Sequence, residues 1–168
     1  MMRAVTFKAS MAPVGARDAR LLVLGSLPGD ASLAAQRYYA HPTNQFWRLL
    51  GVALEEDLAG LTYDARLERL AARGVAVWDV VERAERPGSL DGAIRSATHN
   101  ALAEYVAGHP RLAAVGFNGK TAAAIGRRAL GEGRSTLIDL PSSSAAYTLP
   151  FAAKSERWRV LAGFVDPG

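Results

Sequence analysis

The chain has 168 residues, a length typical of one domain with a single hydrophobic core. Hydrophobic residues make up 49% of it, which excludes an intrinsically disordered protein. The formal net charge is +4 and the sequence pI is about 9.8, a balance that favours an anionic partner such as nucleic acid. Because arginines supply most of this charge and are scattered along an alanine-rich and glycine-rich chain, charge alone does not assign a partner.

The absence of cysteine removes several kinds of chemistry. It excludes disulfides, thiolate catalysis and cysteine-ligated zinc or iron–sulfur clusters. The histidines His41, His99 and His109 have no recognisable metal-ligand spacing, so we expect neither a metal nor a cofactor. No apolar run is long enough to span a bilayer, and residues 1–10 lack the apolar segment of a secretory signal. We therefore expect a cytoplasmic protein without membrane segments.

Short apolar runs alternate with helical periodicity along the chain. Strands are predicted at residues 21–24, 75–78, 112–117 and 136–140. Helices are predicted at residues 45–54, 63–73, 98–106, 120–130 and 154–165, with Thr98 as the N-cap of the third. This alternation predicts an α/β fold in which helices cover both faces of a parallel sheet.

Each predicted strand ends in an unusual segment. The four segments are Gly25-Ser26-Leu27-Pro28-Gly29, Trp78-Asp79, Asn118-Gly119-Lys120 and Pro141-Ser142-Ser143-Ser144. Because ligands bind beyond the carboxyl ends of parallel strands, we expect the four to meet at one crevice. The first segment has neither the GxxxxGKS/T nor the GxGxxG spacing of phosphate-binding loops, which argues against a nucleotide hydrolase.

Aromatic and polar residues are densest between positions 38 and 47. A pocket that stacks a flat ring and hydrogen-bonds its edges needs this mixture. The alternative for Phe46 and Trp47 is the hydrophobic core, and the alternative for Asn44 is to cap the helix that begins near Gln45. The serine-rich segment 141–147 offers hydroxyl and amide groups to phosphates, or is an ordinary flexible loop.

Taken in order, these segments resemble the uracil-DNA glycosylase superfamily, and most of all its hypoxanthine-DNA glycosylase branch, also called DNA-deoxyinosine glycosylases. The matching positions are 25–29 with 32–33, 38–42 with 44, 46 and 47, 77–80, 88–91, 117–120, 140–144, 154 and 158. The resemblance implies one domain over residues 1–168 with a three-layer α/β/α fold. Its short central sheet is expected to be mainly parallel and four-stranded, and residues 1–19 to be irregular.

The resemblance also implies an activity. It is the removal of a deaminated base from DNA in base excision repair, without an abasic-site lyase step and without a cofactor. Leu27 lies where mismatch-specific relatives carry a polar Asn, so the resemblance moves the polar role to Asn44. Tyr39 falls where related enzymes place an aromatic ring against the flipped base.

The expected site residues fall into three groups. The catalytic residue is Asn44. The base-pocket residues are Ser26, Leu27, Pro28, Gly29, Tyr39, His41, Phe46 and Asp79. The DNA-binding residues are Ser89, Asn118, Gly119, Lys120, Pro141, Ser142, Ser143, Ser144 and Tyr147.

Several assignments stay open at this level. Asp79 and Asp91 are candidate carboxylates for the sugar cation or for water, although helix capping is the favoured role of Asp91. His41 either contacts a phosphate or fixes the loop that presents Asn44. Tyr147 stands where the family has Asn and is a candidate wedge for the opened duplex. The leading function is hypoxanthine release by a monomer acting on DNA; the alternatives are a uracil or xanthine glycosylase and a non-catalytic DNA-binding module.

Overall fold

The computed structural model describes residues 7–9, 11–85 and 95–168 and is built around a central five-stranded sheet. Its strands, in spatial order, are β2 (Val14–Gly15), β4 (Val75–Asp79), β3 (Leu21–Gly25), β7 (Ala114–Asn118) and β8 (Thr136–Leu140). All neighbours are parallel except β2, which pairs antiparallel with β4 at the edge. The sheet therefore has one strand more than expected, because a two-residue strand carries no readable periodicity.

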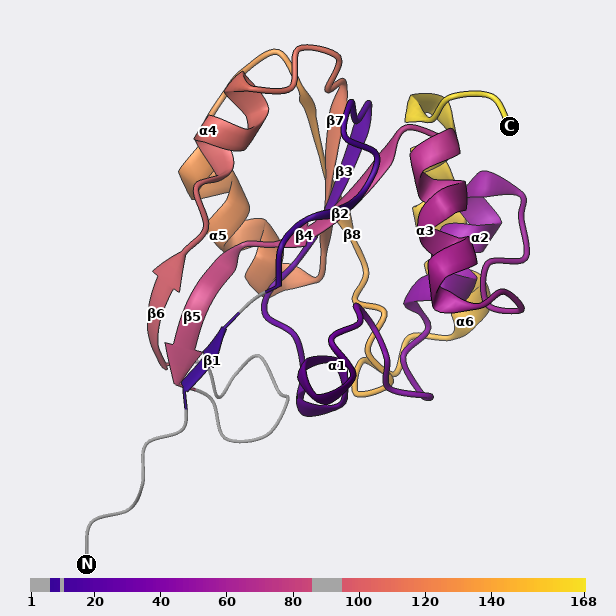
Figure 1. The fold of residues 1–168 in the computed structure, drawn as a ribbon, viewed down its shortest axis with the longest axis horizontal. Helices are drawn as coiled ribbons and strands as arrows, with labels where there is room; N and C mark the ends of the chain where they lie inside the picture. The colour runs from indigo at the N-terminus through magenta and orange to yellow at the C-terminus, as the bar shows by residue number, and fades with distance from the viewer. Residues whose placement is uncertain (1–6, 10, 86–94) are drawn as a thin grey trace, which may run out of the picture.

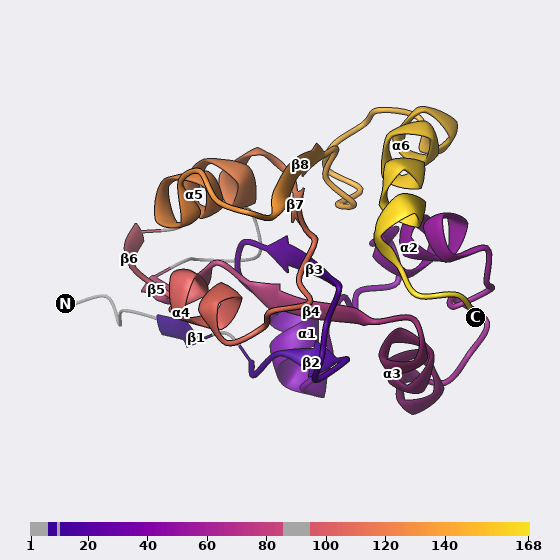
Figure 2. The same ribbon diagram turned by 90° about the horizontal axis from the view of Figure 1, so that it is seen from above.

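Helices cover both faces of this sheet, as Figures 1 and 2 show. One face carries α2 (Phe46–Leu54), α3 (Tyr63–Ala72) and α6 (Phe151–Trp158), which continues as the 3₁₀ helix η2 (Arg159–Phe164). The other face carries α4 (Leu102–Ala107) and α5 (Lys120–Leu130). In β3, Leu21 and Val23 pack on the first side while Leu22 and Leu24 pack on the second. The three-layer α/β/α fold is thus confirmed.

A small antiparallel sheet was not expected. It contains β1 (Phe7–Ala9), β5 (Val81–Glu85) and β6 (Arg95–His99), with β5 in the middle. The prediction of a helix from Thr98 is wrong, since residues 95–99 pair with β5 and the helix begins at Leu102. The expectation of an irregular start is wrong where β1 and β2 form. Within the described residues, no helix is long and apolar enough to cross a membrane.

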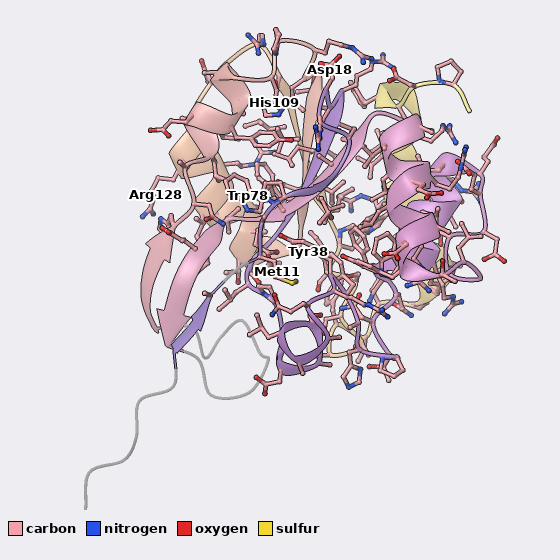
Figure 3. All side chains as sticks on the ribbon, in the orientation of Figure 1. Met11, Asp18, Tyr38, Trp78, His109 and Arg128 are labelled. Atoms are coloured by element: carbon pink, nitrogen blue, oxygen red, sulfur yellow. The ribbon has the colours of Figure 1, made fainter. Side chains whose placement is uncertain are left out.

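The register of the sheet decides where the site lies. Gly25 of β3 is opposite Asp79 of β4, and Asn118 of β7 is opposite Leu140 of β8. The carboxyl ends of these strands are therefore level, and the segments that follow them share one edge. A short helix, α1 (Asp30–Ala35), and the loop after β8 lie at this edge, at the bottom of Figure 1. Tyr38, labelled in Figure 3, lies there too, with its hydroxyl donating to the carbonyl oxygens of Met11 and Ala12, both at 2.9 Å.

Candidate active site

A cavity of about 320 Å³ opens at the carboxyl edge of the sheet. It takes residues from the ends of all four parallel strands and from the segment that precedes α2. Its walls are Gly25, Ser26, Leu27, Pro28, Gly29, Ala31, Ser32, Tyr38, Tyr39, His41, Thr43, Asn44, Asp79, Asn118, Ser142, Ser143, Ser144, Ala145 and Ala146. The convergence expected from the strand ends is confirmed.

Tyr39 provides an aromatic wall. Its ring lies on that of Phe46 with centroids 3.7 Å apart and planes 11° apart. Its backbone is in the left-handed region at φ 55°, a conformation that costs a non-glycine residue about 1–2 kcal/mol. Phe46 is fully buried and lies behind Tyr39, so it supports the wall and does not line the cavity.

The carbonyl oxygen and the amide nitrogen of the Asn44 side chain have different surroundings. Its Oδ1 accepts from the backbone N–H of Phe46 at 2.9 Å and from Ser143 Oγ at 2.8 Å. Its Nδ2 has no hydrogen-bond partner among the described residues, and the residue lines the cavity. The carbonyl of Asn44 therefore fixes the start of α2, while the amide is available to a ligand. The N-cap residue of α2 is Gln45, so Asn44 lies one residue before the cap and is not the N-cap itself; its contact with Phe46 is compatible with its position in the pocket.

Behind Asn44 lies a buried pair from β7 and the loop after β8. Asn118 accepts from the backbone N–H of Ser143 at 2.8 Å and donates from Nδ2 to Ser143 Oγ at 2.8 Å and to the hydroxyl oxygen of Tyr39 at 3.2 Å. The two residues are only 7% and 1% exposed. Their polar atoms are thus engaged within the protein and connect Tyr39 to Asn44.

The serine loop, residues 141–144, is anchored at its carbonyl oxygens. The indole Nε1 of Trp158 donates to Pro141 O at 2.9 Å, and the backbone N–H of Gln45 donates to Ser143 O at 2.9 Å. These contacts hold the loop against α6 and α2. Its serines, Ser142, Ser143 and Ser144, are therefore a fixed part of the cavity wall.

Lys154 of α6 completes the anchoring. It is 1% exposed, and its ammonium donates to Ser144 O at 3.1 Å and Gln45 Oε1 at 2.9 Å. Burial lowers the pKa of Lys154 from its ordinary value. The sequence places Lys154 in the closing helix but carries no signal for these contacts, because the partners are 10 and 109 residues away.

Asp79 and Gly25 form the floor near Tyr39. A Cβ atom on Gly25 would lie 2.5 Å from the Tyr39 hydroxyl oxygen and 2.7 Å from Asp79 Oδ1, so any larger residue here would force these two side chains to shift. The carboxyl of Asp79 is buried. Burial raises the pKa of the Tyr38 phenol, and the negative charge of Asp79 raises it further. The floor therefore holds the carboxyl of Asp79 beside a phenol, Tyr38, that resists ionisation.

The other expected residues differ in position. Ser26, Leu27, Pro28, Gly29 and His41 line the cavity. The imidazole Nδ1 of His41 accepts from the backbone N–H of Thr43 at 3.2 Å, an arrangement that supports the role in fixing the loop before Asn44.

Besides Phe46, four expected residues lie outside the cavity wall: Gly119, Lys120, Pro141 and Tyr147. Lys120 and Tyr147 are exposed. Ser89 and Asp91 lie outside the described residues. Seven wall residues are not among the expected site residues: Gly25, Ala31, Ser32, Tyr38, Thr43, Ala145 and Ala146. In the part of the chain that the structure describes, no group of acidic or histidine side chains could hold a metal ion.

The fold and the cavity define an α/β protein with a polar and aromatic pocket at the carboxyl edge of its sheet. A family model described as "Uracil DNA glycosylase superfamily" matches residues 12–162. The chain belongs to this superfamily of DNA glycosylases.

Individual relatives agree with this assignment. The chain is 38% identical over 138 residues to a protein from Methanosarcina barkeri named "Hypoxanthine DNA glycosylase", covering 82% of this chain and 87% of the relative. It is 37% identical over 144 residues to a protein of the same name from Methanosarcina acetivorans, covering 86% and 90%. A solution NMR structure of a protein named as a uracil DNA glycosylase from Methanosarcina acetivorans superposes with a TM-score of 0.79 at 33% identity, covering 94% and 97%.

Proposed function

We propose that this chain is a monofunctional DNA glycosylase that releases hypoxanthine from deoxyinosine. The observation that carries the proposal is the amide nitrogen of Asn44, which has no partner among the described residues and belongs to a cavity walled by Tyr39. The names of the two Methanosarcina relatives support hypoxanthine as the base. Deaminated bases carry carbonyl oxygens, which accept hydrogen bonds from such a donor.

The proposed reaction is hydrolysis of the bond between the sugar C1′ and the base. The base is flipped out of the duplex and stacks on Tyr39, a contact worth about 1–3 kcal/mol. The bonding electron pair leaves with the base while positive charge develops on the sugar. Asn44 donates to the departing base, and one such donor lowers the barrier by about 3–4 kcal/mol. A water oxygen then bonds to C1′, and its proton balances the charge on the base.

The remaining groups receive supporting roles in this proposal. The carboxylate of Asp79 stabilises the sugar cation from the pocket floor. Lys120 and Tyr147 are exposed beside the site and contact the DNA. The protein acts as a monomer in the cytoplasm on a DNA substrate.

The test uses labelled duplexes that carry inosine, uracil or xanthine. After incubation with the protein in buffer containing EDTA, abasic sites are cleaved with alkali. The proposal expects strand breaks with inosine, only after alkali. Preferential cleavage at uracil or xanthine would reassign the base, breaks without alkali would reveal a lyase step, and binding without cleavage of any substrate would indicate a non-catalytic module.

A further inference from the structure

We propose that Ser143 is a positioning residue that commits Asn44 to donating hydrogen bonds into the cavity. The proposal deepens the proposed function and rests on it. It concerns a residue that the sequence assigns to DNA contact, and it starts from the directions of the hydrogen bonds between Asn118, Ser143 and Asn44.

Asn44 and Asn118 are the two ends of this chain of hydrogen bonds, and in each of them a backbone N–H group shows which side-chain atom is the oxygen. The atom of Asn44 that faces the N–H of Phe46 at 2.9 Å must be the carbonyl oxygen, since a backbone N–H only donates. By the same argument, the atom of Asn118 that faces the N–H of Ser143 at 2.8 Å is Oδ1, so its Nδ2 points to Ser143 Oγ. If the oxygen and nitrogen of either side-chain amide were exchanged, its NH2 group would face a backbone N–H, and two donors would be placed against each other.

The hydroxyl of Ser143 is then left with one arrangement. It accepts from Asn118 Nδ2 at 2.8 Å and gives its single proton to Asn44 Oδ1 at 2.8 Å. With Ser143 and Phe46 as donors, both acceptor positions of Asn44 Oδ1 are filled. Asn44 therefore has only N–H groups to offer a ligand, which suits an electron-rich leaving base and not the deprotonation of water.

Ser143 has no hydrogen-bond donor to spare for this ligand. Its backbone N–H donates to Asn118 Oδ1, its carbonyl accepts from Gln45, and the residue is 1% exposed. The hydroxyl therefore acts through Asn44. Hydrogen-bonded chains of this kind also polarise their members, which strengthens the terminal donor.

The test is a double-mutant cycle between Ser143→Ala and Asn44→Ala, measured as single-turnover excision of hypoxanthine. We expect Ser143→Ala to lower the rate about tenfold, because Phe46 still restrains Asn44. We expect no further loss from Ser143→Ala when Asn44→Ala is already present. Affinity for a duplex with an abasic-site analogue, which has no base, should stay unchanged.

The matched control is Ser155→Ala, another buried serine, whose Oγ has no hydrogen-bond partner among the described residues and does not line the cavity. It should keep the wild-type rate. Ser143→Cys, which keeps the size but weakens the hydrogen bonds, should show the same loss and serves as the second variant if Ser143→Ala fails to fold.

Three results would overturn the proposal: a near-wild-type rate for Ser143→Ala, an equal loss in the Asn44→Ala background, or weakened binding of the abasic duplex that accounts for the whole effect.

If the wild-type protein releases no base, the proposed function fails separately. Side-chain amide NMR then tests the positioning, since Ser143→Ala or Ser143→Cys should shift and broaden the Asn44 resonances. Unchanged resonances would refute the positioning role.

Discussion

The rings of Tyr39 and Phe46 lie nearly parallel, with centroids 3.7 Å apart. Phe46 in turn meets the rings of Trp47 and Trp158 edge-on, at 5.0 Å and 5.7 Å. The wall of the cavity is therefore a continuation of the hydrophobic core. This continuity lets Tyr39 hold its left-handed backbone and present a fixed face to a ligand.

The first prediction concerns this wall. Tyr39→Ala should weaken productive binding of an inosine duplex by about 1–3 kcal/mol, the value of one base–aromatic stack. Tyr39→Phe keeps the ring and should lose much less. The measurement is the enzyme concentration that gives half-maximal single-turnover excision. Equal losses for the two variants would mean that the hydroxyl, and not the ring, makes the contribution.

The second prediction uses the close approach at Gly25. Gly25→Ala should lower excision by about tenfold or more, because its Cβ would displace the Tyr39 hydroxyl and Asp79, at 2.5 Å and 2.7 Å. Gly133→Ala is the matched control, since a Cβ there meets nothing within 4 Å. A Gly25→Ala protein with wild-type activity would show that the positions of these two side chains do not matter for the reaction.

The sequence predicts best where one element carries its own signal. Residues 120–130 have helical periodicity between Gly119 and Gly131, and α5 has these bounds. The strand ends are predictable because each apolar run stops at a glycine, a polar residue or a proline. The five-residue strand β6 is not, because residues 95–99 contain no apolar alternation and its pairing with β5 is a tertiary effect.

The site shows the same division. Tyr39, Asn44 and Asp79 are expected from their segments and their family resemblance, and all three line the cavity. The contact of Ser143 with Asn44 could not be predicted, because 99 residues separate them and the contact depends on the relative placement of β8 and α2. Residue types are enough to predict which segments form the cavity. The directions of the hydrogen bonds can be assigned only from the atomic positions.

The third prediction concerns Tyr147, which is 44% exposed on the loop after β8. Its ring centroid lies 5.3 Å from the ammonium of Lys154, which holds it beside the serine loop. As a wedge in the opened duplex, it should offset a few kcal/mol of unstacking. Tyr147→Ala should therefore reduce excision from double-stranded DNA more than from single-stranded DNA. Leu61→Ala, at another exposed apolar side chain, controls for surface changes; equal losses on both substrates would rule out the wedge.

The fourth prediction concerns stability at high pH. Burial raises the pKa of Tyr105 to about 12, from 10.0 for an exposed phenol. A raised folded-state pKa contributes stability that is complete below pH 10.0 and is lost as pH rises to about 12. Tyr105→Phe keeps the ring and removes this ionisation. Between these pH values, the melting temperature of Tyr105→Phe should therefore fall less than that of the wild type. A constant difference between the two melting temperatures would contradict the raised pKa of Tyr105.

The last prediction concerns Asn44 itself. Asn44→Ala removes both the acceptor that fixes the start of α2 and the donor to the ligand, whereas Asn44→Asp keeps acceptor oxygens and removes the amide. Loss of a side-chain acceptor at a helix start costs about 1 kcal/mol of stability and leaves the chemistry intact. Loss of a transition-state donor lowers the rate of bond cleavage by about a hundredfold or more.

Single-turnover excision of hypoxanthine at saturating enzyme, measured with a thermal melt for each variant, separates these roles. We expect both Asn44→Ala and Asn44→Asp to remain folded and to lose about a hundredfold or more in rate. Near-wild-type rates in both variants would show that Asn44 only restrains the start of α2 through Phe46, and would contradict its role as the donor to the departing base.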